Sequence, residues 1–438
     1  MQPRQHIAAM RFGLGASLDQ PAMGDPQAWL HRQIRPLPPA PGPTTAQGLA
    51  AIRAERAANA GGAPLTPGQQ RPPDIIRAEA GAWARRMLAT EAPFAERMAE
   101  FWSNHFTISR RQGGVIAILG AYQREAIRPH VFGRFSDILL AVLRHPGMIM
   151  YLDNAGSVGP NSLAGQRQGR GLNENLAREI MELHTLGVRG GYGQEDVTSL
   201  AKIITGWSVG RGAAFSEPDG FMFRPGAHEP GPKTLLGQSF AEGEAGGMAA
   251  LAFLANHPST HAFLATKLVR HFVADEPPPG AVRRIAAVLA ETQGDLGAAA
   301  RALVALPEAW APPLTKLRAP QDYAVATIRA LGVGEDGGQA LLGAMANLAQ
   351  PLWTALGPNG WPDLGAEWAA PEQLMRRLDW VTNMASRMAA IGRPDPREVA
   401  EATLGPLLKS ETAQAVRRAG SLREAMTLLL ASPEFQRR

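Results

Sequence analysis

The densest group of potentially reactive side chains lies in residues 173–186, NENLAREIMELHTL. At 100° per residue, Asn175, Arg178, Glu179 and Glu182 fall within one arc of about 100° on a helix. Two carboxylates one turn apart, Glu179 and Glu182, can bind a cation or share a proton. The same spacing also suits a solvated face on which Arg178 pairs with Glu182. From these residues, both interpretations stay open.

Histidines outside this arc supply further candidate bases or ligands. His105 ends the apolar and aromatic run FWSNH, where a packed histidine at a helix C-terminus is the alternative. His228 and Lys233 lie in the Gly/Pro-rich stretch AHEPGPK, and polar residues on turns are often functional, although a plain surface turn also fits. His184 lies opposite Glu182 on an ideal helix, and it joins the carboxylates only if the helix unwinds near its end. We interpret His271 as a structural residue at a helix end.

Several kinds of site are excluded by residue type. The chain has no cysteine, which removes disulfides, thiolate zinc sites, iron–sulfur clusters and cysteine nucleophiles. Any metal would need His, Asp and Glu ligands. The strong helical metal signatures are absent, as are the phosphate-binding loop with Gly-Lys-Ser/Thr, the Gly-x-Ser-x-Gly elbow and a dinucleotide-binding glycine pattern placed after a strand.

Composition narrows the class of protein and of partner. The 438 residues are 45% apolar and 19% charged, so the chain can bury a sizeable core. The net charge of +5 is small for this length, and the arginines are dispersed, which argues against nucleic-acid binding. No apolar run reaches membrane-span length, and the N-terminal stretch lacks a signal-peptide pattern. We therefore expect a cytoplasmic protein without a membrane span.

The elements that must position these residues are mostly helices. Apolar residues recur at helical spacing over much of the chain, from about residue 75 to 207 and from about 246 to the end. Residues 36–73 carry much Pro and Gly and predict an excursion over the surface, with a short helix inside it. Residues 208–240 are rich in Gly, Pro and Phe. The prediction is a mainly α, multi-helix fold with one small β-hairpin or ordered loop near 220–237.

Two domains are predicted. Residues 1–240 would form a helical domain with a polar pocket, and residues 246–438 a second helical layer. An internal echo supports the second: GDLGAAARALVALPE (294–308) and GSLREAMTLLLASPE (420–434) are identical at 7 of 15 positions. A duplicated helical hairpin and two ordinary helices that stop at proline both explain the echo.

The longer motifs resemble a known family. FWSNHFTIS (101–109), the run from Gly171 to Trp207, FRPGAHEPGPKTLLG (223–237), HPSTHAFLATKLVRHFVADEPP (257–278) and LASPEFQ (430–436) are similar to the bacterial domain-of-unknown-function family 1800, over nearly the whole chain. The resemblance implies no established activity. It implies relatives that are often exported and often encoded beside a sulfatase-like protein. This chain departs from them in lacking an export signal and in carrying His228-Glu229 where many relatives have His-Asp.

Two functional hypotheses follow from the residues that the family motifs place together: His105, Asn175, Arg178, Glu179, Glu182, His184, Asp196, His228 and Lys233. In the first, the chain is a hydrolase. The catalytic residues are His105, Glu179, Glu182 and His228. In one form of this hypothesis, a divalent metal is bound by Glu179, Glu182 and His228; in the other, the chemistry is plain acid–base catalysis. An anionic substrate is held by Asn175, Arg178 and Lys233.

In the second hypothesis, the chain is a non-catalytic helical scaffold or accessory protein. The polar motifs then form a buried network that fixes helix packing, and the surface binds a partner protein such as the sulfatase-like neighbour.

Overall fold

Helices form in most of the segments where apolar residues recur at helical spacing. The structure is a computed structural model that describes residues 3–18, 23–62, 65, 68–168, 171–210, 212, 220–391 and 394–438. The predicted mainly α fold is confirmed. None of the described helices combines the length and hydropathy needed to cross a bilayer.

The helices that precede the first strand are α1 (Pro3–Ile7), α2 (Pro26–His31), α3 (Thr45–Asn59), α4 (Pro72–Ala89), α5 (Pro93–His105), α6 (Leu119–Tyr122), α7 (Phe135–Arg144), α8 (Pro146–Tyr151), α9 (Leu163–Gln168), α10 (Asn175–Glu179) and α11 (Gln194–Ile203). Those that follow the last strand are α12 (Glu244–Ala255), α13 (Pro258–Phe272), α14 (Pro279–Glu291), α15 (Leu296–Ala305), α16 (Pro320–Ala330), α17 (Gly338–Asn347), α18 (Pro371–Ile391), α19 (Pro396–Thr403), α20 (Ser410–Arg418) and α21 (Leu422–Leu430).

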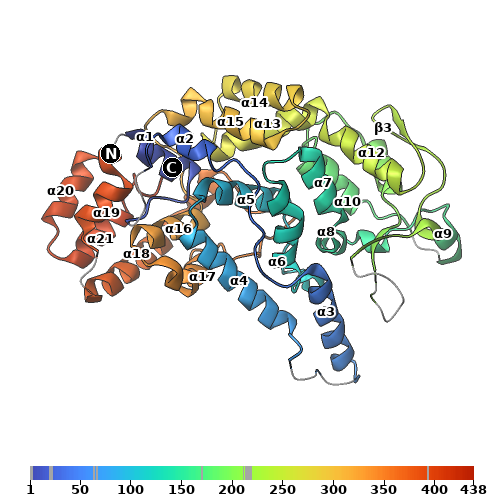
Figure 1. Cartoon of the computed structure of the whole chain (residues 1–438), viewed down its shortest axis with the longest axis horizontal. Helices are drawn as coiled ribbons and strands as arrows, with labels where there is room; N and C mark the ends of the chain where they lie inside the picture. Colours follow the sequence, from blue (N-terminus) through green and yellow to red (C-terminus); the bar gives the residue numbers. More distant parts are fainter. Residues whose placement is uncertain are drawn as a thin grey trace.

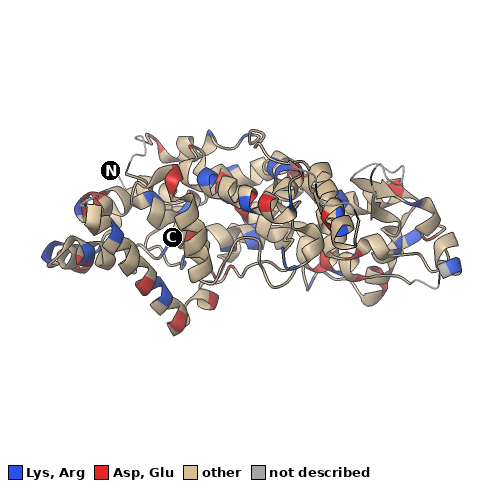
Figure 2. Cartoon of the chain, turned by 90° about the horizontal axis from the view of Figure 1, so that it is seen from below, with Lys and Arg blue, Asp and Glu red and all other residues tan. Residues whose placement is uncertain are grey.

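The molecule is elongated, and its helices are spread along the long axis (Figure 1). Helices α18 to α21 lie at one end, and β3, α9 and α12 lie at the other. Between them, α5 occupies the middle, with α13, α14 and α15 along the upper edge. Basic and acidic residues alternate along the whole length rather than gathering in one region (Figure 2).

Two hydrophobic cores hold the helices in place. The first gathers buried residues from Ile7 to Trp310, including Phe12, Trp102 and Leu268. The second is built around Tyr323 and the C-terminal helices, with contributions from α4. The first core therefore combines helices from both sides of the predicted boundary at 240–246, and the division into domains at that point stays a prediction.

The 36–73 excursion contains a long helix. Helices α3 and α4 pack against each other and extend together from the body of the molecule (Figure 1). A capping box starts α3, because the Thr44 hydroxyl accepts from the Gln47 amide while the Gln47 side chain accepts from the Thr44 amide. We call residues 45–89 the helical arm.

The predicted single hairpin is matched by two antiparallel strand pairs. Strands β1 (Trp207–Val209) and β2 (Phe221–Phe223) form one, and β3 (Lys233–Leu235) and β4 (Gln238–Phe240) form the other. A two-residue turn joins β3 to β4, with φ of 49° at Leu236 and 77° at Gly237. Positive φ at both positions suits the twist of a tight hairpin.

The echoed sequences adopt the same local structure. Helices α15 and α21 start from Asp295 and Ser421, whose side chains accept from the backbone amide three residues on. Each is the second helix of a packed pair, α14 with α15 and α20 with α21.

Candidate functional site

A cavity of about 130 Å³ lies between α5, α13 and α16, in the middle of the molecule. We call it the central cavity. It is lined by apolar residues and by a concentrated set of ionisable groups, of which the most informative are Arg97, His105, Lys267, His271, Asp322 and Asp363. A concave site with a few convergent polar groups is the usual form of a small-molecule site.

Helix α13 presents two of these groups from one face. Leu264, Leu268 and Phe272 recur every fourth residue and are buried in the core. Lys267 and His271 are also four residues apart, on the neighbouring stripe, and both line the cavity. The proline at the first helical position and the His257 side chain, which accepts from the Ser259 amide, set where this helix begins.

Lys267 is joined to His105 across the two helices. Its Nζ atom donates to Nδ1 of His105 at 2.9 Å, and Nε2 of His105 donates to the carbonyl oxygen of His184 at 3.1 Å. These partners assign the ring proton of neutral His105 to Nε2, because Nδ1 must accept.

Burial changes the titration of this group of bases. Burial lowers the pKa of Lys267 to about 8. Burial and the nearby Lys267 charge lower the pKa of His105 well below its usual value, and lower the pKa of His184 to about 3. Both imidazoles are therefore neutral at physiological pH, and Lys267 can lose its proton near that pH.

His271 forms a dyad with a carboxylate from a distant segment. Its Nδ1 atom donates to Oδ1 of Asp363 at 3.0 Å, and its Nε2 atom is buried without a hydrogen-bond partner among the described residues. Burial lowers the pKa of His271 to about 4. Although burial opposes ionisation of Asp363, the positive charges of His271, Lys316 and Arg438 hold its pKa below the usual range. Lys316 also pairs with Asp275, at 2.6 Å.

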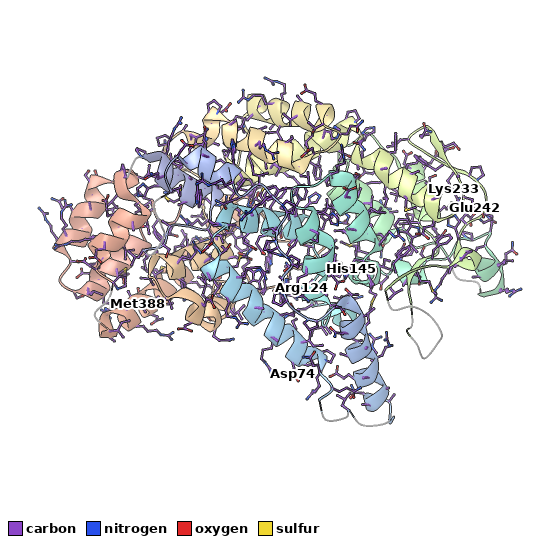
Figure 3. The ribbon with its side chains drawn as sticks, in the orientation of Figure 1. Asp74, Arg124, His145, Lys233, Glu242 and Met388 are labelled. Carbon is purple, nitrogen blue, oxygen red and sulfur yellow. The ribbon has the colours of Figure 1, made fainter. Side chains whose placement is uncertain are left out.

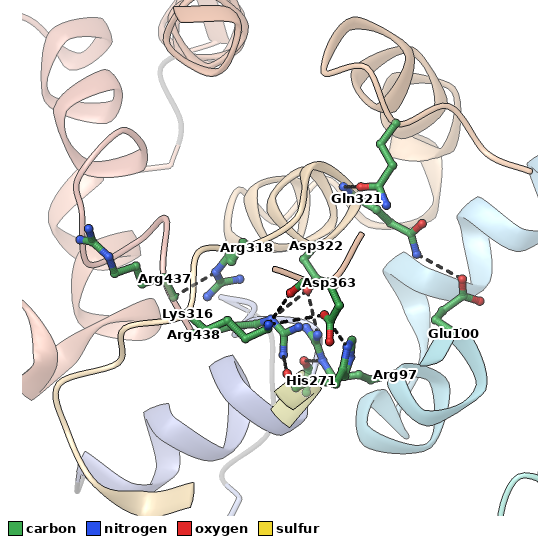
Figure 4. Close-up of polar contacts among 12 residues, drawn as sticks. Arg97, Glu100, His271, Lys316, Arg318, Gln321, Asp322, Asp363, Arg437 and Arg438 are labelled. Carbon is green, nitrogen blue, oxygen red and sulfur yellow. Dashed lines mark hydrogen bonds and ion pairs between the residues drawn. The ribbon is translucent and has the colours of Figure 1, made fainter. Parts of the chain in front are cut away.

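Two arginines share one carboxylate beside the dyad (Figure 4). Arg97 Nη1 and Arg438 Nε each lie 2.9 Å from Oδ2 of Asp322. Arg97 Nε donates to the carbonyl oxygen of Gly13 at 2.6 Å, while its Nη2 has no partner among the described residues. With Lys267, the two guanidinium groups outnumber the two carboxylates of Asp322 and Asp363 in the cavity wall, and this excess of positive charge suits an anionic ligand.

An irregular segment that includes Trp353 and Trp361 closes one side of the cavity. The Asn104 side chain holds Trp361 at both backbone groups, donating to its carbonyl oxygen at 2.9 Å and accepting from its amide at 2.8 Å. Gly360 adopts φ of 74°, and a Cβ there would lie 2.5 Å from the Asn104 carbonyl oxygen. Only glycine fits this close approach. Asn104, the neighbour of His105 in the chain, therefore fixes the cavity wall.

The helix that carries the predicted carboxylates ends in a wider turn. Helix α10 continues into a π-helix over Ile180–His184, and single π-turns of this kind are frequent at functional sites. On the sequence alone, His184 joins the carboxylates only if the helix unwinds near its end, and this wider turn is such a change in the helix. The His184 ring lies beside His105, however, and not beside Glu182: it is fully buried, tilted by 55° from the His105 ring, with ring centroids 6.2 Å apart.

Arg178 does not pair as its spacing predicted. Its Nη2 atom lies 3.2 Å from Oε2 of Glu174 and 3.1 Å from the Gln194 side-chain oxygen. The interpretation in which Arg178 pairs with Glu182 is therefore wrong about the partner, because the chain turns into the π-helix between these residues while Glu174 lies one regular turn before Arg178. The face carries a salt bridge, but with Glu174.

Glu179 and Glu182 remain close enough to interact. Burial and the charge of Glu182 raise the pKa of Glu179. The same carboxylates contribute to the raised pKa of Tyr192, for which burial is the main cause. Within the described part of the chain, no three His, Asp or Glu side chains are arranged to hold a metal ion. The metal site predicted for Glu179, Glu182 and His228 stays a prediction.

His228 is held by hydrogen bonds at both ring nitrogens. Nδ1 donates to the Thr205 carbonyl oxygen at 2.8 Å, and Nε2 accepts from the Gly243 amide at 3.0 Å and from Lys233 Nζ at 3.1 Å. Burial lowers the pKa of His228, so the ring is neutral. The ring therefore fastens its loop to two other segments, which is the packing role that its sequence context did not reveal.

Other residues of this loop and of the second hairpin are also held by hydrogen bonds to distant segments. Both carboxylate oxygens of Glu229 accept from Asn161, at 2.6 Å from its side chain and 2.9 Å from its amide. Asp196 accepts from the amides of Gly193 and Leu236, at 3.0 and 2.8 Å, and so connects α11 to the second hairpin. Lys233 lies toward the end of the molecule that carries β3 (Figure 3), away from α5 in the middle.

Of the predicted site residues, the structure brings His105 to the central cavity. Asn175, Arg178, Glu179, Glu182, His228 and Lys233 are not among the residues that line it. A family model described as a protein of unknown function (DUF1800) matches residues 7–437 of this chain. The chain belongs to the DUF1800 family. No curated protein and no solved structure matches it.

Lys267 and Asp363 of this DUF1800 chain were not singled out from the sequence, and His271, which lines the cavity, was interpreted as a structural residue. Lys267 and His271 carried a detectable signal, because they are four apart on a helix whose neighbouring stripe is apolar. Asp363 carried none: it lies in an irregular segment, 92 residues from the histidine that it contacts.

Proposed function

We propose that this DUF1800 chain is an enzyme that performs general acid–base chemistry on a small anionic molecule bound in the central cavity, with hydrolysis as the reaction class. The observation that carries the proposal is the His271–Asp363 dyad at 3.0 Å, in the wall of a cavity, with Nε2 of His271 unpartnered.

The dyad has the properties of a general base. Asp363 holds the proton of the neutral ring on Nδ1, which leaves the lone pair on Nε2. Because the pKa of His271 is lowered to about 4, the ring is unprotonated at neutral pH. A carboxylate that orients a histidine in this way also stabilises the imidazolium that forms when the base takes a proton from water.

The charge and size of the cavity support a small anion. Arg97, Arg438 and Lys267 line it together with two ionised carboxylates, Asp322 and Asp363. A cavity of about 130 Å³ accepts a molecule of about six heavy atoms. His105, predicted from its motif, takes part by accepting a hydrogen bond from Lys267.

A scaffold or accessory protein is the second candidate function. The 228–243 loop supports it, because the His228 ring and the Glu229 carboxylate use their hydrogen-bonding capacity to connect segments of the chain. In this alternative, the polar motifs rigidify a surface that binds a partner protein.

Direct binding and turnover assays separate the two candidates. The wild-type chain, His271→Asn and Asp363→Asn are assayed by NMR for hydrolysis of methyl acetate, methyl phosphate and methyl sulfate, which fit the size of the cavity. Their thermal unfolding is followed with acetate, phosphate and sulfate. His31→Asn is the matched control, since His31 is exposed at the end of α2. We expect turnover in the wild type and in the control, and its loss in both dyad variants.

If the folded wild type shows neither turnover nor stabilisation by anions, the proposal that the chain is an enzyme is overturned. A stoichiometric protein partner recovered with the same preparation would then favour the scaffold.

A further inference from the structure

We propose that Lys267 is a nucleophile that captures the ketone or aldehyde carbonyl of a small carboxylate as a Schiff base. This inference rests on the proposed function, because the carbonyl compound would occupy the same central cavity. It extends that function by naming a covalent step and the class of substrate.

Lysine is a rare choice of basic residue in this chain. Lys and Arg together number 44, and only five of them are lysines: Lys202, Lys233, Lys267, Lys316 and Lys409. A guanidinium carries the same charge as an ammonium, but it stays protonated and does not attack carbonyl groups. Lysine is thus rare in a chain whose basic residues are mostly arginines. Its presence at position 267, in a cavity wall, therefore indicates that an amine is needed there.

The contacts of Lys267 differ from those of the other lysines near the core. Lys316 is ion-paired to Asp275 at 2.6 Å, and Lys233 is bound by His228 and by the Glu229 carbonyl oxygen. Lys267 forms no ion pair with a carboxylate of the described residues. Its partners are the neutral ring of His105, at 2.9 Å, and the face of Phe263, 5.5 Å from the ring centroid.

These surroundings favour the uncharged amine. Burying an ammonium is costly, and here burial outweighs the attraction of the nearby Asp363 carboxylate, so the group releases its proton more readily. The lowering of the Lys267 pKa to about 8 agrees with this arrangement. The hydrogen bond to His105 also fixes the direction of one N–H bond, and His105 itself is held by the His184 carbonyl oxygen at 3.1 Å. The amine is therefore positioned as well as activated.

The covalent step balances without a further reactant. The neutral amine nitrogen of Lys267 forms a bond to the carbonyl carbon, and the carbonyl oxygen takes up a proton to give a carbinolamine. The C–O bond then breaks, and the oxygen leaves as water. Summed over the step, ammonium and carbonyl compound give a protonated imine and water. His271, one helical turn away on the same face, offers an unpartnered Nε2 for these proton transfers.

The rest of the cavity selects the substrate. Arg97 and Arg438 share the single carboxylate of Asp322, and Nη2 of Arg97 has no partner. These guanidinium groups suit a carboxylate at the far end of the ligand from Lys267. A 2-oxo acid of about six heavy atoms meets the limits of charge, size and reactive group together. Pyruvate and glyoxylate are the probes of this class.

Borohydride trapping tests the proposal on the full chain. Wild type, Lys267→Arg and, as matched control, Lys409→Arg are incubated with pyruvate or glyoxylate and then with sodium borohydride, and the reduced adduct is located by intact and peptide mass spectrometry. Lys409 is exposed at the start of α20. We expect the main lysine adduct on Lys267 in the wild type and in the control. At early times, labelling of Lys267 in the wild type should exceed that of Lys409 on the order of tenfold or more, because the cavity positions the Lys267 amine and burial lowers its pKa.

The outcomes separate this inference from the function on which it rests. No adduct, or labelling spread over Lys202 and Lys409 as much as over Lys267, overturns the Schiff base. Stabilisation of the folded chain by lactate, which lacks the carbonyl, would leave the proposed anion-binding enzyme intact in that case. If neither lactate nor pyruvate stabilises the chain, both fail. Peptide mapping of the wild type decides even if Lys267→Arg does not fold.

Discussion

The Nζ atom of Lys267 lies 2.9 Å from Nδ1 of His105, 162 residues away along the chain. This contact joins α13 to the end of α5 and places an amine and an imidazole at the wall of one cavity. Burial makes the charged form of each group less stable, so His105 is neutral and Lys267 gives up its proton more readily than an exposed lysine. Their titration is therefore coupled to the integrity of the fold.

Replacing Lys267 with Met should change how stability depends on pH. The pKa of Lys267 is about 8 in the folded chain and about 10.4 in an unfolded one. The unfolded chain thus binds a proton that the folded chain releases between these values, and wild-type stability rises with pH there. Relative to the variant, we expect a gain of roughly 1–3 kcal/mol in unfolding free energy from pH 8 to 10.4.

Urea unfolding at several pH values measures this difference. Lys409→Met, at an exposed position, serves as the control and should follow the wild type throughout. Parallel curves for the wild type and Lys267→Met would show that the amine has an ordinary pKa.

Asp363→Asn should weaken the fold at neutral pH. The carboxylate pairs with His271 and lies 3.5 Å from Lys316, whose side chain is only 2% exposed. We expect a loss of about 1–3 kcal/mol at pH 7, because part of the compensation for the Lys316 charge disappears. The folded pKa of Asp363 lies below the unfolded value, so its stabilising contribution is present above about pH 4 and is lost as the pH falls further.

Tryptophan fluorescence during urea unfolding checks this prediction, with the exposed Asp379→Asn on α18 as the control. A difference between wild type and Asp363→Asn that stays constant down to pH 2 would contradict it.

Arg128→Met should be strongly destabilising, because it breaks a buried ion pair with Glu96 on α5. Arg128 makes two hydrogen bonds to Glu96, of 2.6 and 2.8 Å, and both side chains are nearly fully buried. Removing the guanidinium leaves Glu96 with Arg86, at 3.3 Å, as its one cationic partner among the described residues. We expect a loss of about 3 kcal/mol in unfolding free energy.

Arg77→Met provides the comparison, since the Arg77–Asp74 pair is exposed and should be worth no more than about 0.5 kcal/mol. Equal unfolding midpoints for the two variants would show that the buried pair contributes little.

Thr45→Ala should loosen the helical arm without affecting α13. The His145 Nδ1 atom accepts from the Gly147 amide, so Nε2 donates to the Thr45 hydroxyl at 2.8 Å, and that hydroxyl donates to Glu125 at 2.6 Å. The variant breaks this chain of bonds at the start of α3. We expect the α3 amides to exchange hydrogen about fivefold faster, which corresponds to about one lost hydrogen bond.

Hydrogen exchange followed by mass spectrometry measures this effect, and Glu55→Gln, which removes the partly exposed ion pair of the arm with Arg71, is the control. Hydrogen bonds from Thr45 and the nearby His145 ring outweigh burial and lower the pKa of Glu125 to about 2. The protection should therefore weaken in the wild type as the pH falls below about 4 toward 2. Unchanged exchange in Thr45→Ala would show that packing alone holds the arm.

Metal analysis distinguishes the two forms of the proposed hydrolase. Both ring nitrogens of His228 are engaged in hydrogen bonds, so metal binding there would require breaking them. We expect the wild type and a Glu179→Ala/His228→Ala variant, both purified without chelator, to have the same metal content, without a near-stoichiometric metal that the variant loses. Plasma mass spectrometry measures the metal content. A metal lost in the folded variant would instead favour the metal-dependent form.

The sequence by itself determined the class of fold and the family. Apolar residues at helical spacing, prolines at the first positions of α5 and α13, and capping residues such as Asp295 and Ser421 act within a few residues of one another. Such signals do not depend on the rest of the chain, so they predict helices and their ends. The motif that contains His105 likewise pointed to the cavity.

The tertiary structure alone decided which polar groups meet. His271 forms a hydrogen bond with Asp363, which lies in an irregular segment. In the same segment, Ala349 and Trp353 adopt positive φ, a conformation that their residue types do not predict. The same packing directs both nitrogens of His228 to backbone partners, and turns His184 inward through a π-helix. The physical reason is that helix formation depends on neighbours in sequence, whereas the partner of a buried polar side chain depends on how distant helices pack.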